Sequence, residues 1–214
     1  MTEDAPRTRW EDSDSAGYGE RFAQLIADGA DVVGEARLAD VLVGRGATIL
    51  DAGAGMGRIG AELMRRGHRV VAAEKDASLV DQAAARYPDL PLVRTDLLAL
   101  TPDLLREHGL PTSFDLVVLV GNVIVLAAPD TERRMLRTLA DLLGPSGRIL
   151  VGFHPRNSPA ASARAYSFEE FETDVVAAGL AVQHHLGSYE LDPPSADYVV
   201  AVLVRAGQGR PSAR

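Results

Sequence analysis

Three glycines that directly follow a short apolar segment form the part of the sequence best suited to hold a ligand. Residues 47–61 read ATILDAGAGMGRIGA, in which residues 48–50 have the side chains of a buried parallel strand. Gly53, Gly55 and Gly57 lack a Cβ atom, so the backbone can turn tightly there and approach a ligand closely. The residues that follow are expected to form a helix whose free N–H groups point back toward the turn. A strand, a glycine turn and a helix N-terminus together predict a nucleotide-type pocket.

The spacing of the glycines allows two interpretations. Gly55, Gly57 and Gly60 follow the G-x-G-x-x-G pattern of dinucleotide-binding proteins. A carboxylate about 20 residues further on, Glu74, completes that pattern. In that register the strand would run through Asp51 and bury its carboxylate near a pyrophosphate, which is costly. In the alternative G-x-G-x-G register, Asp51 ends the strand and faces the ligand, which suits a positively charged ligand without phosphates, such as S-adenosylmethionine (SAM).

The charge and composition of the chain limit the classes of function. The 214 residues carry a formal net charge of −8, and an acidic protein repels the phosphate backbone of nucleic acids. The absence of cysteine excludes disulfides, thiolate metal sites and cysteine nucleophiles. The sequence contains no apolar run of about 18 residues and no apolar leader, so we expect neither a membrane span nor a signal peptide. These features predict a cytoplasmic protein without nucleic-acid or membrane partners.

Strand-like and helix-like segments alternate along most of the chain. The expected strands cover residues 48–51, 68–73, 90–95, 114–120, 148–153, 180–189 and 198–205. The expected helices cover residues 18–27, 32–43, 58–66, 76–86, 101–107, 130–143 and 167–178. This alternation implies a parallel sheet covered on both faces, in which a hairpin of the last two strands must place one strand antiparallel. Ligands of such sheets bind outside the carboxyl ends of the strands, and the polar residues at those ends are Asp51, Glu74, Asp96, Asn122 and His154.

With these elements in order, the chain resembles the class I SAM-dependent methyltransferases over about residues 47–205. Five blocks carry the resemblance: ILDAGAGMG (49–57), VVAAEKD (70–76), RTDLLAL (94–100), FDLVVLVGNV (114–123) and LLGPSGRILV (142–151). The resemblance implies an α/β fold with a Rossmann-like, seven-stranded, mostly parallel sheet whose last strand is reversed. Helices cover both faces of that sheet, and N-terminal cap helices precede it. The implied activity is methyl transfer from SAM, with S-adenosylhomocysteine as the product.

The resemblance also implies roles for single residues. Asp51 and the glycine turn would hold the methionine end of SAM, and Glu74 would accept hydrogen bonds from both ribose hydroxyls. Asp96 would meet the adenine amino group, whereas Gly121 and Asn122 would lie beside the sulfonium and its methyl group. The implied cofactor-binding residues are Asp51, Gly53, Ala54, Gly55, Gly57, Glu74, Lys75, Asp96, Leu97, Gly121 and Asn122. No metal ligand is expected.

His154 and Asn122 are the residues that we expect to act in methyl transfer. Transfer from a sulfonium is a direct displacement, which needs alignment of the reacting atoms and a base only when the nucleophile is protonated. His154 follows the fifth expected strand and is the candidate base, with a loop histidine of no catalytic role as the alternative. The fourth expected strand ends in GNVI (121–124), without the (D/N)-P-P-(Y/F) motif of similar enzymes that methylate adenine or glutamine.

The sequence predicts one domain between two mobile tails. Residues 1–16 and 207–214 are expected to be the tails, and residues 17–206 the methyltransferase domain. Within that domain, residues 17–45 form the cap helices. Trp10 is the apolar exception in the first tail, and it either packs on the domain or closes over a site.

The acceptor expected from these features is a small molecule that is methylated on an O or N atom. The acidic chain and the lack of a second recognition domain favour this class of acceptor, for a monomer or a homodimer. Two alternatives stay open. One is a SAM-binding protein without catalysis that acts through a partner. The other is an NAD-linked oxidoreductase, from the G-x-G-x-x-G pattern.

Overall fold

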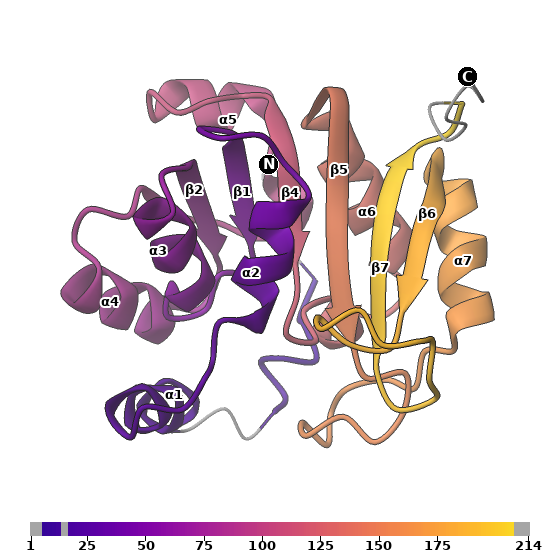
Figure 1. Cartoon of the computed structure of the whole chain (residues 1–214), viewed down its shortest axis with the longest axis horizontal. Coiled ribbons are helices and arrows are strands. Elements are labelled where there is room, and N and C mark those ends of the chain that lie inside the picture. Colours follow the sequence, from indigo (N-terminus) through magenta and orange to yellow (C-terminus); the bar gives the residue numbers. More distant parts are fainter. Residues whose placement is uncertain (1–5, 14–16, 208–214) are drawn as a thin grey trace.

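The computed structural model of the chain describes residues 6–13 and 17–207. Within these residues, seven strands form one sheet in the order β3-β2-β1-β4-β5-β7-β6 (Figure 1). The strands are β1 (Thr48–Ala52), β2 (Arg69–Glu74), β3 (Leu92–Arg94), β4 (Phe114–Leu119), β5 (Leu143–Phe153), β6 (Leu180–Leu186) and β7 (Val199–Arg205). The helices are α1 (Tyr18–Ala27), α2 (Gly34–Val41), α3 (Arg58–Arg65), α4 (Ala77–Arg86), α5 (Pro102–Glu107), α6 (Glu132–Asp141), α7 (Phe168–Ala177) and the 3₁₀ helices η1 (Leu97–Ala99) and η2 (Ile124–Leu126). None of these described helices is both long and apolar enough to cross a membrane.

The directions of the strands confirm the expected fold. β1 pairs in parallel with β2 and β4, β2 with β3, and β4 with β5. β7 runs antiparallel to both β5 and β6, so the last strand is the reversed one. All five residues of β1 are buried, which is typical of a central strand in a parallel sheet covered on both faces.

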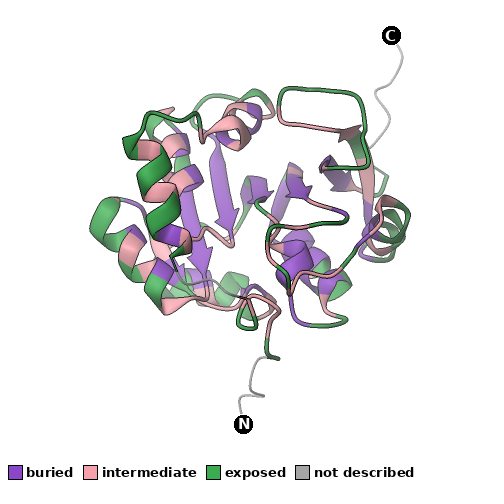
Figure 2. Cartoon of the chain, turned by 90° about the horizontal axis from the view of Figure 1, so that it is seen from below, coloured by how far each residue is buried: buried purple, intermediate pink, exposed green. Residues whose placement is uncertain are grey.

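Two hydrophobic clusters fill the two faces of the sheet, and the strands therefore lie buried between helices (Figure 2). Val117 of β4 belongs to the same cluster as Leu136 of α6 and Phe171 of α7. Its neighbour Leu116 belongs to the other cluster, together with Leu63 of α3. Successive residues of a strand point to opposite faces, so one apolar strand serves both clusters. Because helices occupy both faces, the carboxyl ends of the strands are the part of the sheet left for a ligand.

The largest difference from a predicted boundary is at the start of β5. The sequence GPSG at residues 144–147 was expected to follow a helix that ends at residue 143, yet α6 ends at Asp141 and β5 already begins at Leu143. The pairing of β4 with β5 shifts register between Phe114 and Leu116, so the glycine-rich segment is an irregularity within the strand. A Cβ atom on Gly147 would lie 2.7 Å from the carbonyl oxygen of Phe114, and glycine permits this close contact.

Residues 6–13, which we call the strap, are not the mobile tail expected from their composition. The backbone N–H of Trp10 donates to the carbonyl of Leu126 at 3.1 Å, and that of Arg9 donates to the carbonyl of Ala127 at 3.4 Å. The strap therefore lies against η2 and the residue that follows it. The remaining parts of the expected tails, residues 1–5, 14–16 and 208–214, lie outside the described residues.

Gly152 of β5 provides a test of the packing between the sheet and the tyrosines that cover it. A Cβ atom there would collide with the hydroxyl of Tyr189 and lie 3.0 Å from the hydroxyl of Tyr198. We expect Gly152→Ala to lower the free energy of unfolding by about 1–3 kcal/mol, since overpacking a filled region forces side chains to shift. Urea unfolding measures this change. Gly44→Ala is the matched control because a Cβ atom on Gly44 would meet no atom within 4 Å, and equal effects of both substitutions would contradict the packing described.

Candidate functional site

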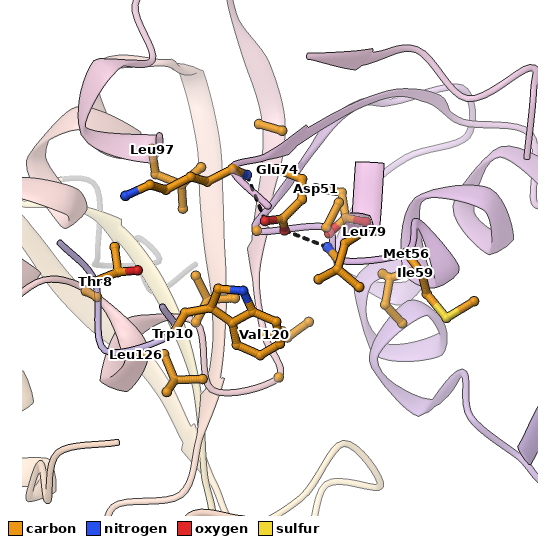
Figure 3. Close-up of a pocket in the computed structure, with 18 of the residues that line it drawn as sticks. Thr8, Trp10, Asp51, Met56, Ile59, Glu74, Leu79, Leu97, Val120 and Leu126 are labelled. Atoms are coloured by element: carbon orange, nitrogen blue, oxygen red, sulfur yellow. Dashed lines mark hydrogen bonds between the residues drawn. The ribbon is translucent and has the colours of Figure 1, made fainter. Parts of the chain in front are cut away.

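A cavity lies at the carboxyl ends of β1, β2 and β4 (Figure 3). It has a volume of about 990 Å³, including the part open to solvent. Its walls come from the turn after β1, the end of β2, the residues that follow β3 and β4, the first helix α1 and the strap. This is the edge of the sheet at which the sequence predicted a ligand site.

The turn between β1 and α3 has the backbone shape that its glycines predicted. Gly53, Gly55 and Gly57 have φ angles of +76°, +56° and +82°. The N–H groups of Gly53 and Ala54 both donate to the carbonyl of Ala73, at 2.8 and 3.1 Å, which ties the turn to β2. A Cβ atom on Gly53 would lie 2.6 Å from Val123, so the turn can follow this path only with glycine.

Asp51 does not end the strand, so that part of the prediction is wrong, although Asp51 does line the cavity. β1 continues to Ala52, and Asp51 is paired with Ala72 and Val118 on its two sides. The side chain is nevertheless satisfied, because Oδ2 accepts a hydrogen bond from the backbone N–H of Gly60 at 2.8 Å. Burial raises the pKa of Asp51 to about 7, so the neutral form is also accessible near neutral pH. A carboxylate can therefore lie inside this strand without the cost of an unpaired charge.

Glu74 ends β2 as predicted and is held by three backbone groups. Its Oε2 accepts from the N–H of Gly55 at 2.8 Å, and its Oε1 accepts from the N–H groups of Lys75 and Asp76 at 2.7 and 2.8 Å. Burial raises the pKa of Glu74, although these three N–H groups favour the ionised form. A carboxylate accepts about four hydrogen bonds, so about one position is left for a ligand. Binding of two ribose hydroxyls would require Glu74 to share or release a backbone bond.

Asp96 both caps a helix and lines the cavity. Its Oδ1 accepts from the N–H of Leu98 at 2.9 Å, at the start of η1. Its Oδ2 is buried and makes no hydrogen bond within the described residues. The ammonium of Lys75 lies 3.2 Å from that oxygen, at the distance of an ion pair. The two groups attract each other while Oδ2 keeps an open acceptor position, because charge attraction does not need the alignment of a hydrogen bond. Leu97, beside Asp96, also lines the cavity.

The structure brings Asn122 and His154 together beside the cavity rather than within it. Gly121 lines the cavity, but neither Asn122 nor His154 does. The Oδ1 atom of Asn122 accepts from the backbone N–H of His154 at 2.8 Å and lies 3.0 Å from Nδ1 of the same residue. An amide oxygen can only accept, so Nδ1 carries the proton and Nε2 keeps its lone pair. Burial lowers the pKa of His154, against the attraction of Asp197, which favours this neutral form.

Several residues of the cavity wall come from the N-terminal part of the chain. The rings of Trp10 and Tyr18 lie 5.3 Å apart, and those of Tyr18 and Phe22 lie 5.0 Å apart, as a row of aromatic side chains. Arg58 also lines the cavity, and the sequence reasoning missed it. Its guanidinium forms a bidentate pair with Glu35 of α2, at 2.8 and 3.0 Å. Its position as the first residue of the helix after the glycine turn was the signal available in the sequence.

The charges around the cavity fit a ligand that has positive groups and no phosphate. Three carboxylates line it, those of Asp51, Glu74 and Asp96. The two cations of the wall are Arg58, which is paired with Glu35, and Lys75, which is paired with carboxylates. Neither cation is therefore available, without breaking a pair, to neutralise a pyrophosphate. A glycine cradle with carboxylates suits the sulfonium and ammonium groups of SAM.

Comparisons with known proteins give a consistent result. A family model described as a methyltransferase domain matches residues 49–147. No curated protein matched the chain. Among solved structures, the chain is similar to a TehB-like SAM-dependent methyltransferase from Corynebacterium glutamicum. The two share 34% sequence identity with a TM-score of 0.78, over 89% of this chain and 97% of the other.

Two more distant structures share the fold. One is the 1,6-didemethyltoxoflavin-N1-methyltransferase of Burkholderia thailandensis with bound 1,6-didemethyltoxoflavin and S-adenosylhomocysteine. Its identity is 22% and its TM-score 0.61, over 89% of this chain and 88% of the other. The other is the glycopeptide N-methyltransferase MtfA complexed with SAM, at 15% identity and a TM-score of 0.63, over 82% of this chain and 95% of the other.

The buried carboxyl of Asp51 predicts a specific dependence of stability on pH. In the folded state the group keeps its proton up to a pKa of about 7, whereas an unfolded aspartate loses it near pH 4. The folded state therefore binds the extra proton, and its stability from this group declines as pH rises between those values. The amide side chain introduced by Asp51→Asn does not titrate. From pH 8 to pH 5, we expect the wild type to gain about 2–3 kcal/mol relative to this variant.

Urea unfolding of both proteins at several pH values measures this difference. The comparison between the two proteins cancels the contributions of the other carboxylates, which include groups with lowered pKa such as Asp40 and Glu62. Parallel stability curves for the two proteins would contradict a raised pKa at Asp51.

Proposed function

Because the chain belongs to the SAM-dependent methyltransferase family, we propose that it is an enzyme that transfers the methyl group of SAM to an O or N atom of a small molecule. The observation that carries this proposal is the row of carboxylates along one glycine-lined cavity. Asp51 and Glu74 belong to β1 and β2, and Asp96 follows the neighbouring β3, so all three lie at the carboxyl edge of the sheet. An NAD-linked reaction is disfavoured, since the only two cations of the described cavity wall are already paired with carboxylates.

The proposed binding roles follow the order of the strands. The glycine turn, with Ala54 and the buried Asp51, holds the methionine end of the cofactor. Glu74 holds the ribose, with Lys75 beside it. Asp96 accepts from the adenine amino group through its open oxygen Oδ2, with Leu97 at its side. SAM supplies a methyl carbon activated by the adjacent sulfonium, and Gly121 lies at the strand end where that group is expected.

The acceptor class rests on the shape of the cavity wall. Trp10, Tyr18 and Phe22 form an aromatic side of the cavity, which suits a compact acceptor with apolar surface. The N-methyltransferases among the similar structures, one for 1,6-didemethyltoxoflavin and one for a glycopeptide, are in keeping with transfer to nitrogen. Their identities to this chain lie below 25%, so the choice between O and N is left to experiment.

Asn122 and His154 are proposed to supply the base. Asn122 holds the proton on Nδ1 of His154, and the other ring nitrogen is then free to take a proton from an acceptor hydroxyl or ammonium. Asn122 has a φ angle of +73°, a backbone conformation that is strained for a residue other than glycine. This backbone conformation directs its side-chain amide at His154. In this role Asn122 is a positioning residue. His154 directly follows β5, which pairs with β4, and the cavity-lining Gly121 follows the end of β4.

Calorimetry with SAM and with NAD tests the proposal directly. We expect the protein to bind SAM and not NAD. Glu74→Gln should bind SAM at least tenfold more weakly, because an amide loses one of the acceptor oxygens that this carboxylate offers. Asp81→Asn, an exposed substitution on α4, is the matched control and should bind SAM normally. Binding of NAD without SAM would overturn the proposed function, and normal binding by Glu74→Gln would remove Glu74 from the ribose site.

Transfer of labelled methyl from SAM to a panel of phenols, carboxylic acids and amines tests catalysis. With the best acceptor, we expect His154→Ala to lower turnover by about 100-fold while the affinity for SAM stays unchanged. His108→Ala, which changes an exposed histidine, is the control. Full activity of His154→Ala would exclude it as the base. Tight SAM binding without transfer to any acceptor would favour the alternative of a SAM-binding protein that acts through a partner.

A further inference from the structure

The strap lines the cavity at the half where the adenosine of the cofactor is expected. Thr8 and Trp10 line the cavity from residues that precede the first helix. Figure 3 shows the indole of Trp10 beside Leu126 and facing the part of the cavity that contains Glu74. A second hollow is also lined by Trp10, together with Lys75 and Asp96. The strap thus forms a boundary between the cavity and the solvent.

Trp10 is held in place both by its backbone and by its side chain. Its backbone N–H donates to the carbonyl of Leu126 at 3.1 Å, after the fourth strand. Its ring nitrogen Nε1 donates to Oδ2 of Asp76 at 2.8 Å, directly after the second strand. Asp76 also caps α4 and lies two residues beyond Glu74, the residue proposed for the ribose. Trp10, which lines the cavity, therefore links η2 to the start of α4.

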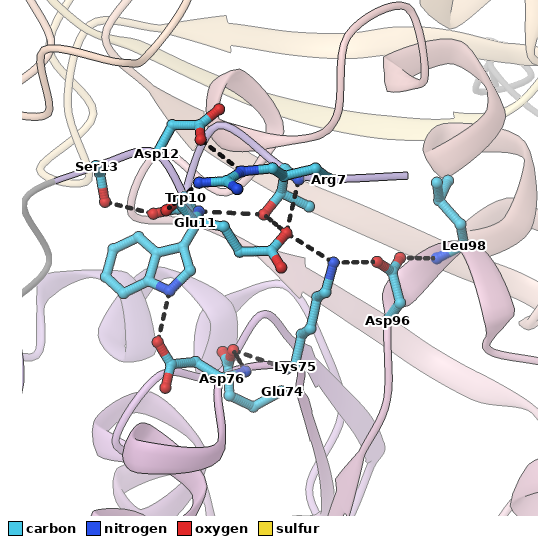
Figure 4. A network of polar contacts seen from close by, with 11 residues as sticks. Arg7, Trp10, Glu11, Asp12, Ser13, Glu74, Lys75, Asp76, Asp96 and Leu98 are labelled. Carbon is cyan, nitrogen blue, oxygen red and sulfur yellow. Dashed lines mark hydrogen bonds and ion pairs between the residues drawn. The ribbon is translucent and has the colours of Figure 1, made fainter. Parts of the chain in front are cut away.

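Glu11 ties the strap to the proposed adenine site through one ammonium group. Oε2 of Glu11 lies 2.9 Å from Nζ of Lys75, and the same Nζ lies 3.2 Å from Oδ2 of Asp96 (Figure 4). Glu11 is held for this contact because Oε2 also accepts from the backbone N–H and the hydroxyl of Thr8, at 2.7 and 2.8 Å. Lys75 thereby joins the strap to the buried Oδ2 of Asp96, the oxygen that we propose accepts from the adenine amino group.

Arg9 anchors the strap on the other side of the cavity. Its guanidinium donates to Oε1 of Glu132 at 3.0 Å and to the carbonyl of Ala127 at 2.9 Å. Glu132 is 2% exposed and also pairs with Arg164 at 3.0 Å. Loss of Arg9 would leave the buried carboxylate of Glu132 with one cation instead of two, which is costly. The Glu11–Lys75 contact is more exposed and contributes less. The strap is therefore held firmly at Arg9 and weakly over the cavity at Glu11.

From this arrangement we propose that Trp10 and Glu11 are residues of the cofactor site, with Trp10 as its roof over the adenosine half. Lys75 contacts both Glu11 of the strap and Asp96 of the proposed adenine site. Through this Glu11–Lys75–Asp96 bridge, adenine bound at Asp96 stabilises the strap in its position over the cavity. This inference rests on the proposed function, since it takes SAM as the cofactor. It follows that the strap retards release of the cofactor, and that the adenosine part of the ligand, rather than its methionine part, holds the strap closed.

The fluorescence of Trp10 reports on the strap without any label, because it is the only tryptophan of the chain. The full-length protein is mixed with SAM, 5′-methylthioadenosine or methionine, and quenching by acrylamide is measured. We expect SAM and methylthioadenosine to lower the quenching constant at least twofold, and methionine to leave it unchanged. Equal quenching with and without bound SAM would overturn the inference.

Variants of the bridge test its part in cofactor release. Glu11→Gln and Lys75→Met should each speed dissociation of labelled SAM by about two- to fivefold, the range expected for a partly exposed ion pair, and Lys75→Arg should restore much of the wild-type rate. Asp12→Asn is the matched control in the same strap, because the described contact of Asp12 is an exposed pair with Arg7. Trp10→Phe should also speed release, since it loses the bond to Asp76.

The outcomes separate the two proposals. If SAM binds by calorimetry but Glu11→Gln and Trp10→Phe release it at the wild-type rate, the inference is overturned and the proposed function stands. If SAM does not bind to the wild-type protein, the proposed function itself fails. Thermal unfolding of each variant without ligand shows whether a changed release rate arises from a general loss of structure. A faster release by the bridge variants without a change in the quenching of Trp10 would also count against the strap as a roof.

Discussion

The hydrogen bond between the buried carboxylate of Asp51 and the backbone of Gly60 is the constraint on which the site depends. It joins the second-to-last residue of β1 to the first turn of α3, with the glycine turn between them. A Cβ atom on Gly60 would lie 3.1 Å from that carboxylate oxygen, so a larger residue would crowd the helix away from the strand. With both ends of the turn fixed, its amides are fixed too, and the N–H of Gly55 reaches Glu74.

Acidic residues at the ends of the neighbouring strands likewise have two functions: they bind backbone N–H groups, and they line the cavity. Glu74 holds three backbone N–H groups, and Asp96 holds the start of η1 with one oxygen while the other stays open. Asp76 caps α4 and accepts from Trp10. Groups that are already held by the backbone keep their orientation when a ligand arrives, which is the basis of a preorganised site. The positions of these carboxylates follow from the ends of the strands, rather than from mobile loops.

The parts of the structure that could be predicted are those specified by neighbouring residues. The positive φ angles of Gly53, Gly55 and Gly57 and the reversal of the last strand follow from local spacing and from chain topology. Asp51 was misplaced because its partner, the N–H of Gly60, becomes adjacent only when helix and strand pack. The G-x-G-x-x-G spacing is explained by that contact, and it does not require a dinucleotide. Of the strap, only the packing of Trp10 was expected from the sequence, because most of the other residues are polar and their partners lie far away in the sequence.

The distance along the chain between Arg9 and Glu132 has a consequence for the order of assembly. These partners are 123 residues apart, whereas the strands at the centre of the sheet pair over much shorter loops. During synthesis Arg9 emerges first, yet its acceptor exists only after α6 has been made. Docking of the N-terminal residues through Arg9 therefore cannot begin until β1 to β4 and the start of α6 have been made. The strand ends that line the cavity are thus synthesised before the residue that anchors the strap beside them.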